Sequence, residues 1–449
     1  MDSRASASLY HGLKSRLKWI ALFILALSIS SFLQQLFMAK MPTFCLVQYN
    51  DSTVVFEDDI SGRKNISNDD KVQGVIEPSQ SFQPQSYSSR IYSGNHVNDE
   101  QVFHDSYIFL ENYKEMKRSF KIYVYPHNRD DPFANALLPS DHEPRGNYAS
   151  EGYFKKVLMK SEFITEDPNR ADLFYLPFSI ASLRHDPRVD VHGIPNFIRD
   201  YISNISTKYP FWNRTGGADH FYAACHSIGK IAMNKVSEAK FNAIQFVCSS
   251  NYFVPGYISH KDACLPQIWP REGEPPNLLS SKRTRLAFFA GAINSPVRQK
   301  LHAAWRNDSE IFVNYGRLTT PYGDELLKSK FCLHVKGYEV NTARIGDSLY
   351  YGCVPVIIAD YYDLPFTDIL NWRSFSVVVT TADIPLLKQV LNGISSSEYL
   401  KLQSNVMKVR KHFQWHLSPV DYDVFYMAMY ELWLRRSFVK APFLVSNNS

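Results

Sequence analysis

The chain has 449 residues and a formal net charge of +5 at pH 7. Hydrophobic residues make up 45% of it and aromatic residues 14%, which is enough apolar surface for two packed domains. Lysines and arginines are dispersed along the chain rather than gathered in one basic stripe. The composition therefore excludes nucleic acid as the expected partner.

An uncharged apolar segment, residues 19–39, stands near the N-terminus and is long enough to cross a bilayer once as a helix. Basic residues precede it and only Lys40 follows closely, which predicts a cytosolic tail at residues 1–18 and type II topology. The alternative is a cleaved signal peptide, with Ser28, Ser30 and Ser31 as small residues for cleavage. The apolar run continues past these serines, so the sequence favours a signal-anchor.

Residues 40–100 are rich in Ser, Asn, Asp and Gln and show neither helical nor strand periodicity, as is typical of a flexible stem. Asn-x-Ser/Thr sequons occur throughout the sequence after the anchor, as a luminal position allows. They predict glycosylation at Asn50, Asn65, Asn204, Asn213 and Asn307.

Five cysteines of the folded region also indicate an oxidising compartment. We expect disulfides Cys225–Cys248 and Cys332–Cys353, because each pair lies within one expected domain. The number is odd, so at least one cysteine stays free or pairs outside the set, and Cys264 is the candidate.

Two folded domains are expected. In residues 101–280, apolar runs such as FKIYVYP, ADLFYLPFS and FNAIQFVC alternate with helical segments, which predicts a parallel sheet covered on both faces. After a proline-rich joint, residues 281–440 repeat the alternation more clearly. The predicted fold is α/β, with two Rossmann-like doubly wound domains facing a cleft and ligand at the carboxyl ends of the second set of strands. The last helix, from about Pro419 to Arg436, is expected to pack back across the joint.

The turn after the predicted strand FCLHV is the strongest candidate for a nucleotide site. Gly337 lies just past the strand end, and Asn341 or Thr342 can cap the next helix, so free backbone N–H groups suit a diphosphate. Arg344 and Asp347 share one face of that helix, where they could bind phosphate and ribose hydroxyls. The alternative is an ordinary surface ion pair.

Four more residues complete the predicted nucleotide-binding set. Gly291 and Arg298 belong to the first strand-to-helix turn of the second domain, which allows a ligand to approach the backbone. Tyr338 and Glu339 stand beside Gly337, and Glu339 also has a purely structural alternative.

Candidates for a general base lie in the first domain. Asp219, His220 and His226 surround a glycine pair, and Glu151 begins a predicted helix that could aim it at the cleft. For the first three, a structural role near the disulfide is an equally good interpretation. The single Asp-x-Asp match, Asp421 to Asp423, is more simply the acidic start of a helix, so no catalytic metal is expected.

The motifs KIYVYP, YASEGYF, DPNRADLFYLPFS, PFWNRTGGADHFYAACH, SKFCLHVKGYEV and GCVPVIIADYYDLPF together resemble the exostosin-like glycosyltransferases, family 47, and the plant branch in particular. They cover nearly all of residues 118–415. One departure is that the family more often has Glu where this chain has Asp347.

This resemblance implies a GT-B fold, a Golgi type II enzyme with its catalytic part in the lumen, inverting chemistry and a UDP-sugar donor without further cofactor. The implied acceptor is a cell-wall polysaccharide or a glycoprotein glycan, and other glycosyltransferases are possible further partners. The alternative function is a non-catalytic exostosin-like subunit of a glycan-synthase complex. Retention of Arg298, Gly337 and Arg344 favours the enzyme.

Overall fold

The computed structural model describes residues 101–437, except 234, 254–256, 272–274 and 279–281. The expected tail, anchor and stem, with the sequons at Asn50 and Asn65, lie outside the described residues. Within the described part, no helix is both long and apolar enough to cross a membrane. Asn204, Asn213 and Asn307 are exposed, so each is accessible for the glycosylation that the sequence predicts.

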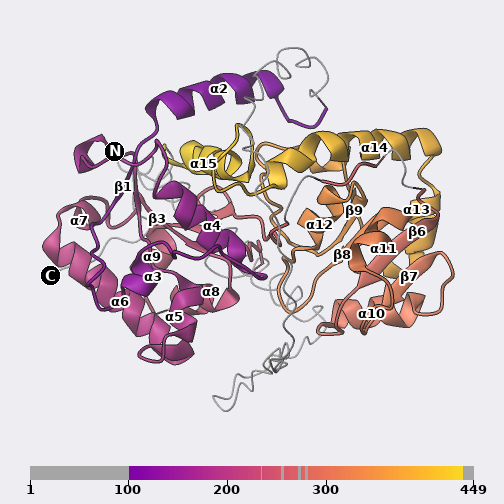
Figure 1. Ribbon diagram of the computed structural model, residues 1–449, viewed down its shortest axis with the longest axis horizontal. Coiled ribbons are helices and arrows are strands. Elements are labelled where there is room, and N and C mark those ends of the chain that lie inside the picture. Colours follow the sequence, from indigo (N-terminus) through magenta and orange to yellow (C-terminus); the bar gives the residue numbers. More distant parts are fainter. Residues whose placement is uncertain (1–100, 234, 254–256, 272–274, 279–281, 438–449) are drawn as a thin grey trace, which may run out of the picture. The chain divides into compact units, whose positions relative to one another are not determined.

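Two five-stranded sheets are present, and every strand pair in them is parallel (Figure 1). The first contains β1 (Ile122–Val124), β2 (Leu173–Tyr175), β3 (His220–Ala224), β4 (Ile244–Val247) and β5 (Ala263–Cys264). The second contains β6 (Arg285–Ala290), β7 (Ile311–Asn314), β8 (Ser329–Val335), β9 (Val354–Ile358) and β10 (Val377–Val378). The predicted parallel α/β fold is confirmed.

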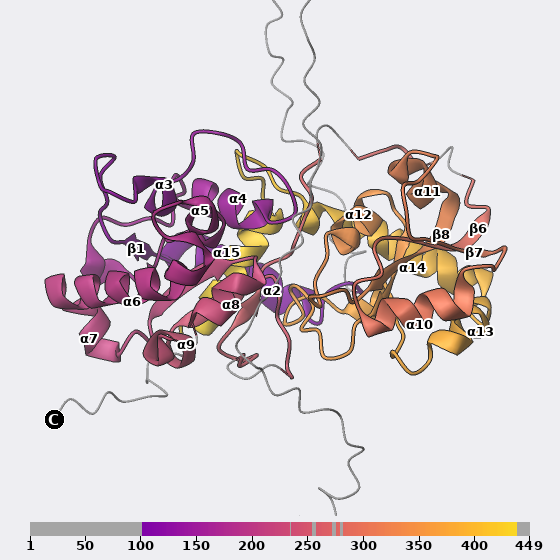
Figure 2. The same ribbon diagram turned by 90° about the horizontal axis from the view of Figure 1, so that it is seen from below.

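Both faces of the first sheet are buried, which explains its continuous apolar runs. Leu173 and Tyr175 pack into one hydrophobic cluster, whereas Phe174 between them packs into a second cluster on the other face. Helices of this half are α2 (Ser106–Ser119), α3 (Ala134–Leu137), α4 (Ala149–Leu158), α5 (Ile180–His185), α6 (Asp190–Lys208), α7 (Phe211–Thr215), α8 (Ser227–Met233) and α9 (Ser237–Asn242). The long helix α6 packs against α5 and α8 (Figure 2).

The helices around the second sheet begin where the sequence supplies caps. Ser295 accepts a hydrogen bond from the backbone N–H of Arg298, and Pro296 takes the first helical position of α10. Helices of this half are α10 (Pro296–Trp305), α11 (Tyr322–Lys328), α12 (Arg344–Tyr350), α13 (Leu387–Asn392), α14 (Ser396–Val409) and α15 (Val424–Arg435). Short 3₁₀ turns occupy Pro168–Arg170, Trp372–Ser374, Ile384–Leu386 and Arg410–Phe413.

The two sheets differ in strand order, and this corrects the prediction of two doubly wound domains. The first sheet runs β1-β2-β3-β4-β5, so its described strands contain no point where the order reverses. The second runs β10-β9-β8-β6-β7. Its chain moves from β6 outward to β7 and then returns to the other side of β6. In α/β sheets such a reversal opens a crevice at the carboxyl ends of the strands, which here lies between β6 and β8.

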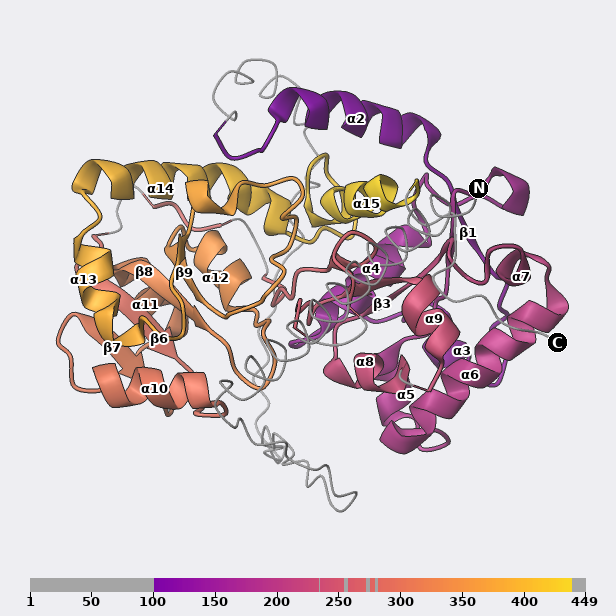
Figure 3. The ribbon, with the colours of Figure 1, turned by 180° about the vertical axis from the view of Figure 1, so that it is seen from behind.

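Both sheets belong to one compact unit and share a hydrophobic core. The last helix connects them, as expected, but it begins at Val424 rather than near Pro419. The reason is that Tyr422 has a left-handed backbone with φ of 69°, and Asp423 caps the helix by accepting from Phe425 and Tyr426. Helix α14 lies against β9 and α12 (Figure 3).

Two disulfides join the pairs named above, Cys225 with Cys248 and Cys332 with Cys353. The first ties the carboxyl ends of β3 and β4 together, and the second ties β8 to the residue before β9. Cys264 is a buried free thiol.

Candidate active site

Two arginines converge where the strand order of the second sheet reverses. Arg298, in the first turn of α10, donates to the carbonyl oxygens of Val335 (Nε, 3.2 Å) and Ala292 (Nη1, 3.0 Å). Arg344, the first residue of α12, donates from Nε and Nη2 to the carbonyl oxygen of Ala290 at 3.1 and 2.7 Å. Their guanidinium carbons lie 5.4 and 5.2 Å from the centre of the Phe289 ring. The elements following β6 and β8 thus bring two cations to one place.

The hydrogen-bond partners of the two arginines are neutral groups. Among the residues that the structure describes, no ion pair joins Arg298 or Arg344 to a carboxylate, and their hydrogen bonds go to neutral carbonyls. Burial and the neighbouring Arg344 lower the pKa of Arg298 to about 10, which still leaves it protonated at neutral pH. Two close cations that form no ion pair with a carboxylate are a suitable site for an anionic group.

The glycines predicted to admit a ligand instead make room for these arginines. A Cβ atom on Gly337 would lie 2.8 Å from Nη2 of Arg298, and one on Gly291 would collide with the Arg344 guanidinium. The glycines therefore lie beside the two arginines, and the group that approaches their backbone is a protein side chain.

His334, which the sequence analysis did not single out, supports the turn after β8. It is fully buried, and its ring nitrogens contact the Thr342 hydroxyl (3.1 Å) and the Val340 carbonyl (2.9 Å). Burial lowers its pKa to about 3, and the nearby Arg344 and Arg298 act in the same direction, so the ring is neutral. Its only mark in the sequence is that it is a polar residue inside the apolar strand FCLHV.

The helix that carries Arg344 differs from its prediction in two ways. It has seven residues and starts at Arg344 itself, so its dipole contributes little. Asn341 donates to Gln267 at 2.7 Å and has no part in the cap, whereas the Thr342 hydroxyl accepts from the Arg344 N–H at 3.3 Å.

Asp347, which the sequence predicts to bind ribose hydroxyls, already has a partner in the structure. It is 6% exposed and forms an ion pair with Arg271, with Nη2 2.5 Å from Oδ1. Burial raises the pKa of this carboxyl, while Arg271 opposes the shift. The pair lines a pocket of about 280 Å³, whose aromatic walls include Trp269 and Tyr350. Arg271 was missed because it lies in the proline-rich joint, 76 residues before its partner.

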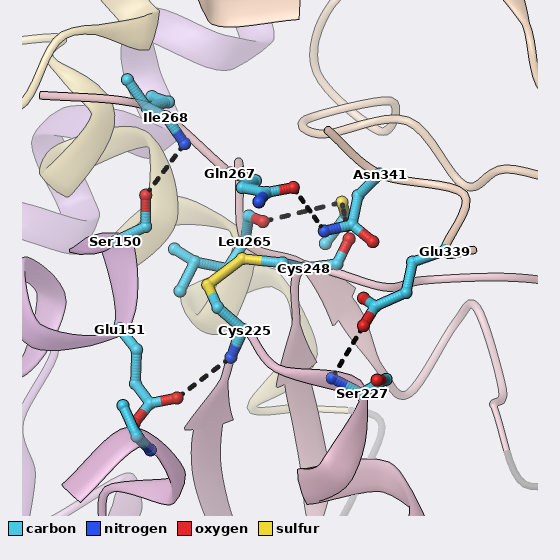
Figure 4. Close-up of a disulfide and its surroundings, with 12 residues drawn as sticks. Ser150, Glu151, Cys225, Ser227, Cys248, Leu265, Gln267, Ile268, Glu339 and Asn341 are labelled. Carbon is cyan, nitrogen blue, oxygen red and sulfur yellow. Dashed lines mark hydrogen bonds between the residues drawn. A yellow bond between two sulfur atoms is a disulfide. The ribbon is translucent and has the colours of Figure 1, made fainter. Parts of the chain in front are cut away.

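The carboxyl ends of the two sheets meet through the loops that follow their strands. Glu339, after β8, accepts from the backbone N–H of Ser227, after β3, at 3.2 Å, as Figure 4 shows. Asn251 and Tyr362, after β4 and β9, form an isolated antiparallel bridge. Glu339 therefore joins the two halves, and Tyr338 beside it is 75% exposed.

Glu151 lies at this same edge but is fully engaged. Its Oε1 accepts from the Ser179 hydroxyl (2.7 Å) and the Ala181 N–H (3.3 Å), and its Oε2 accepts from the Cys225 N–H at 3.1 Å (Figure 4). It is 1% exposed, and burial raises its pKa although the three donors lower it. Glu151 thus holds the loops after β2 and β3 together, which argues against its predicted role as the base.

We expect Glu151→Ala to lower the free energy of unfolding by about 3 kcal/mol, because it leaves three buried donors without an acceptor. Thermal and urea unfolding of the full chain measure this, with Glu166→Ala, at an exposed glutamate, as the matched control. A Glu151→Gln variant of normal stability that had lost turnover would contradict the structural role and restore the catalytic one.

The prediction of Asp219 and His220 as catalytic groups is not supported by their positions. His220 is the first residue of β3, at the end of the strand opposite to the ligand edge, and is 0% exposed. Its ring nitrogens contact Asp219 Oδ1 and the Tyr125 hydroxyl, both at 2.8 Å. Asp219 also accepts from Arg214 and Thr215. This buried network links the start of β3 to the residue that follows β1.

His226 is the base candidate that the structure leaves at the correct edge. It follows the carboxyl end of β3, directly before Ser227, and is half-buried. Nδ1 accepts from the Ile228 N–H (3.1 Å), Nε2 lies 3.1 Å from Nη1 of Arg184, and the ring packs against Tyr148 at 4.4 Å. Burial, aided by Arg184, lowers its pKa to about 4. The imidazole is therefore neutral at pH 7.

Among the described residues, no group of three or more His, Cys, Asp or Glu side chains is placed to hold a metal ion. Asp423 caps α15, and Asp421 bonds to Tyr113 and Lys117.

Comparison with known proteins places this site in a family. The model of the Exostosin GT47 domain matches residues 116–394. A probable glycosyltransferase of Arabidopsis thaliana is 36% identical over 393 residues, which are 84% of this chain and 74% of the relative. The probable beta-1,4-xylosyltransferase IRX10L of the same plant is 28% identical over 57% of this chain and 67% of its own.

Solved structures are more distant. The avilamycin-biosynthesis glycosyltransferase AviGT4 has 12% identity and a TM-score of 0.32, covering 71% of this chain and 98% of its own, which is too distant to add to the fold described above. The family match spans more than half of the chain, and the identity to the Arabidopsis relative extends over most of both proteins. The chain therefore belongs to the exostosin GT47 family and is a glycosyltransferase.

Proposed function

We propose that the chain transfers a sugar from a UDP-sugar, with inversion at the anomeric carbon, onto a cell-wall polysaccharide or a glycoprotein glycan. The observation that carries this proposal is the pair Arg298 and Arg344, two cations without a carboxylate partner at the strand-order reversal. The leaving group of the reaction is a nucleoside diphosphate, which gains negative charge as the glycosidic bond breaks. Fixed guanidinium groups stabilise that charge more in the transition state than in the ground state.

The pocket at Asp347 is where the nucleoside part of the UDP-sugar would bind. Asp347, on the same helix as Arg344, and its partner Arg271 face a space of about 280 Å³ with aromatic walls. A ribose bound there would share the Asp347 carboxylate with Arg271. Because Asp is one methylene shorter than the Glu that is more usual in the family, the nucleoside would lie closer to α12.

The acceptor reaches the donor from the first sheet. His226 follows β3, and its neighbour Ser227 contacts Glu339 on the segment that carries Gly337 and Arg344. We infer that His226 takes the proton from the acceptor hydroxyl as that oxygen attacks C1 of the donor sugar from the face opposite to UDP. A bound diphosphate would raise the low pKa of this imidazole toward neutrality, because opposite charges favour the protonated ring.

The compartment is part of the same proposal. The uncharged segment 19–39 with its preceding basic residues, the disulfides and the exposed sequons are all consistent with a type II protein whose folded part lies in the Golgi lumen. Protease protection of Golgi vesicles tests this. Everything after Lys40 should be shielded, and digestion of an unglycosylated chain from the cytosolic side would contradict it.

The activity is tested with the full chain purified in detergent and a panel of UDP-sugars. We expect slow hydrolysis of one of them and faster turnover when a glycan acceptor is added. An intact, folded protein that binds neither UDP nor any UDP-sugar of the panel would contradict the proposed function.

A further inference from the structure

A second large cavity lies beside α6, in the half of the molecule formed around the first sheet. Its volume is about 670 Å³, which is in the range of ligand-binding sites. One wall is α6, and the other is the segment after β1, from Pro126 to Leu137. It shares no lining residue with the pocket at Asp347.

Helix α6 presents two parallel rows of side chains to this groove. Residues four apart on a helix lie on one face, about 6 Å apart along its axis. That repeat is of the order of the length of one pyranose unit in a linear glycan. One row supplies apolar and aromatic surface (Gly193, Phe197, Tyr201, Ile205), and the adjacent row supplies hydrogen-bonding groups (Asn196, Asp200, Asn204, Lys208).

The opposite wall is held in place before any ligand arrives. The Phe133 ring meets Phe197 edge to face at 4.9 Å, and the Arg188 guanidinium covers Phe133 at 4.4 Å. Asp186 fixes Arg188 by accepting from its Nε at 2.8 Å. A preformed groove avoids the ordering cost of binding.

Charges along the groove are largely compensated. Arg188 is paired with Asp186, Asp200 contacts Arg199 at 3.0 Å, and Lys208 lies over the Tyr209 ring. This distribution selects against strongly anionic or cationic ligands. Sugars combine apolar C–H faces, which pack on the faces of aromatic rings, with rings of hydroxyl groups, which match amide and carboxylate side chains.

We propose that the groove along α6 binds a linear, largely uncharged segment of the glycan acceptor, away from the point of transfer. The proposal rests on the proposed function only in naming the ligand as the acceptor. It implies that affinity for the acceptor grows with chain length, because only a longer chain reaches both the groove and the transfer site.

A glycan attached to Asn204 is the main alternative occupant of the groove. Asn204 lies in the polar row and in the sequon Asn204-Ile205-Ser206, so a glycan attached there could fill the groove itself. Ser206→Ala removes the sequon but leaves the Asn204 side chain, and it therefore separates the two occupants.

The test uses the full chain in detergent and disaccharides and hexasaccharides of β-1,4-linked xylose, glucose and galactose, with binding followed by calorimetry. The groove variants are Asn196→Ala/Phe197→Ala and Asn196→Ala/Asp200→Ala, the second of which changes only exposed side chains. Ser203→Ala, on an exposed part of the same helix outside the groove, is the matched control.

We expect at least one hexasaccharide to bind more tightly than its disaccharide in the wild type, Ser203→Ala and Ser206→Ala. Both groove variants should weaken this binding about tenfold and remove its length dependence at unchanged UDP affinity. The Asn196→Ala/Asp200→Ala variant, which removes only exposed side chains, should also keep the unfolding midpoint of the wild type. In transfer assays they should raise KM for long acceptors and leave kcat unchanged.

Three results would overturn the proposal: hexasaccharide binding equal to the wild type in both groove variants, no length dependence for any probe, or binding that appears only after Ser206→Ala. The last would show that the protein's own glycan fills the groove. A wild type that binds hexasaccharides but not UDP would instead refute the proposed donor while leaving the groove intact.

Discussion

Replacing Arg344 with alanine is expected to reduce the turnover number about a hundredfold, because the departing diphosphate loses one fixed hydrogen-bonding cation. Arg344 uses Nε and Nη2 to hold the Ala290 carbonyl, so other N–H groups of its guanidinium remain for phosphate oxygens. Helix α12 and Phe289 keep that group in position before the donor binds. The measurement is steady-state transfer by the full chain at saturating donor.

Two further variants make this result interpretable. Arg344→Lys keeps the charge but loses the planar fork, so only partial rescue is expected. Arg317→Ala, at an exposed arginine of the same half, should leave turnover unchanged. Near-normal turnover of Arg344→Ala with an unaltered unfolding midpoint would contradict the role of Arg344. The contact with the leaving group would then be assigned to Arg298 and the turn at Gly291.

His226→Ala should likewise lower kcat by on the order of a hundredfold, the usual contribution of a general base, with UDP affinity unchanged. The pH profiles give a second, independent result. In the free enzyme the pKa of His226 is about 4, so kcat/KM should fall only in acid near that value. Bound UDP raises this pKa, so the acid limb of kcat should lie at higher pH than that of kcat/KM.

The matched control is His192→Ala, at an exposed histidine on α6. The role of His226 as the base would be refuted by full turnover of His226→Ala, or by acid limbs of kcat and kcat/KM that coincide in the wild type and persist in the variant.

The sequence predicted the parallel α/β fold because buried parallel strands must be apolar on both faces, as in β2 and β8. It could not predict strand order, since local patterns do not encode which neighbour a strand pairs with. For this reason a reversal of strand order was predicted in both halves, whereas the described strands show it only in the second half, between β6 and β8. The start of the last helix was predicted less well, because the left-handed backbone of Tyr422 delays it from about Pro419 to Val424.

Only those parts of the candidate site that follow from parallel topology could be predicted from the sequence. Gly291, Arg298, Gly337 and Arg344 all follow strand ends, where parallel topology brings residues together. Asp219 and His220 were chosen from their chemistry near a glycine pair, but Asp219 precedes β3 and His220 begins it, so both lie at the amino end of that strand. Arg271 and His334 act through partners set by tertiary packing, which no local pattern reveals.

The most direct test of the central claim is an experimental structure of the full chain with UDP bound. We expect the diphosphate between β6 and β8, with phosphate oxygens within hydrogen-bonding distance of both Arg298 and Arg344, and the ribose near Asp347. A diphosphate bound elsewhere, with both guanidinium groups still contacting only the carbonyls of Ala290, Ala292 and Val335, would contradict the assignment of the donor site.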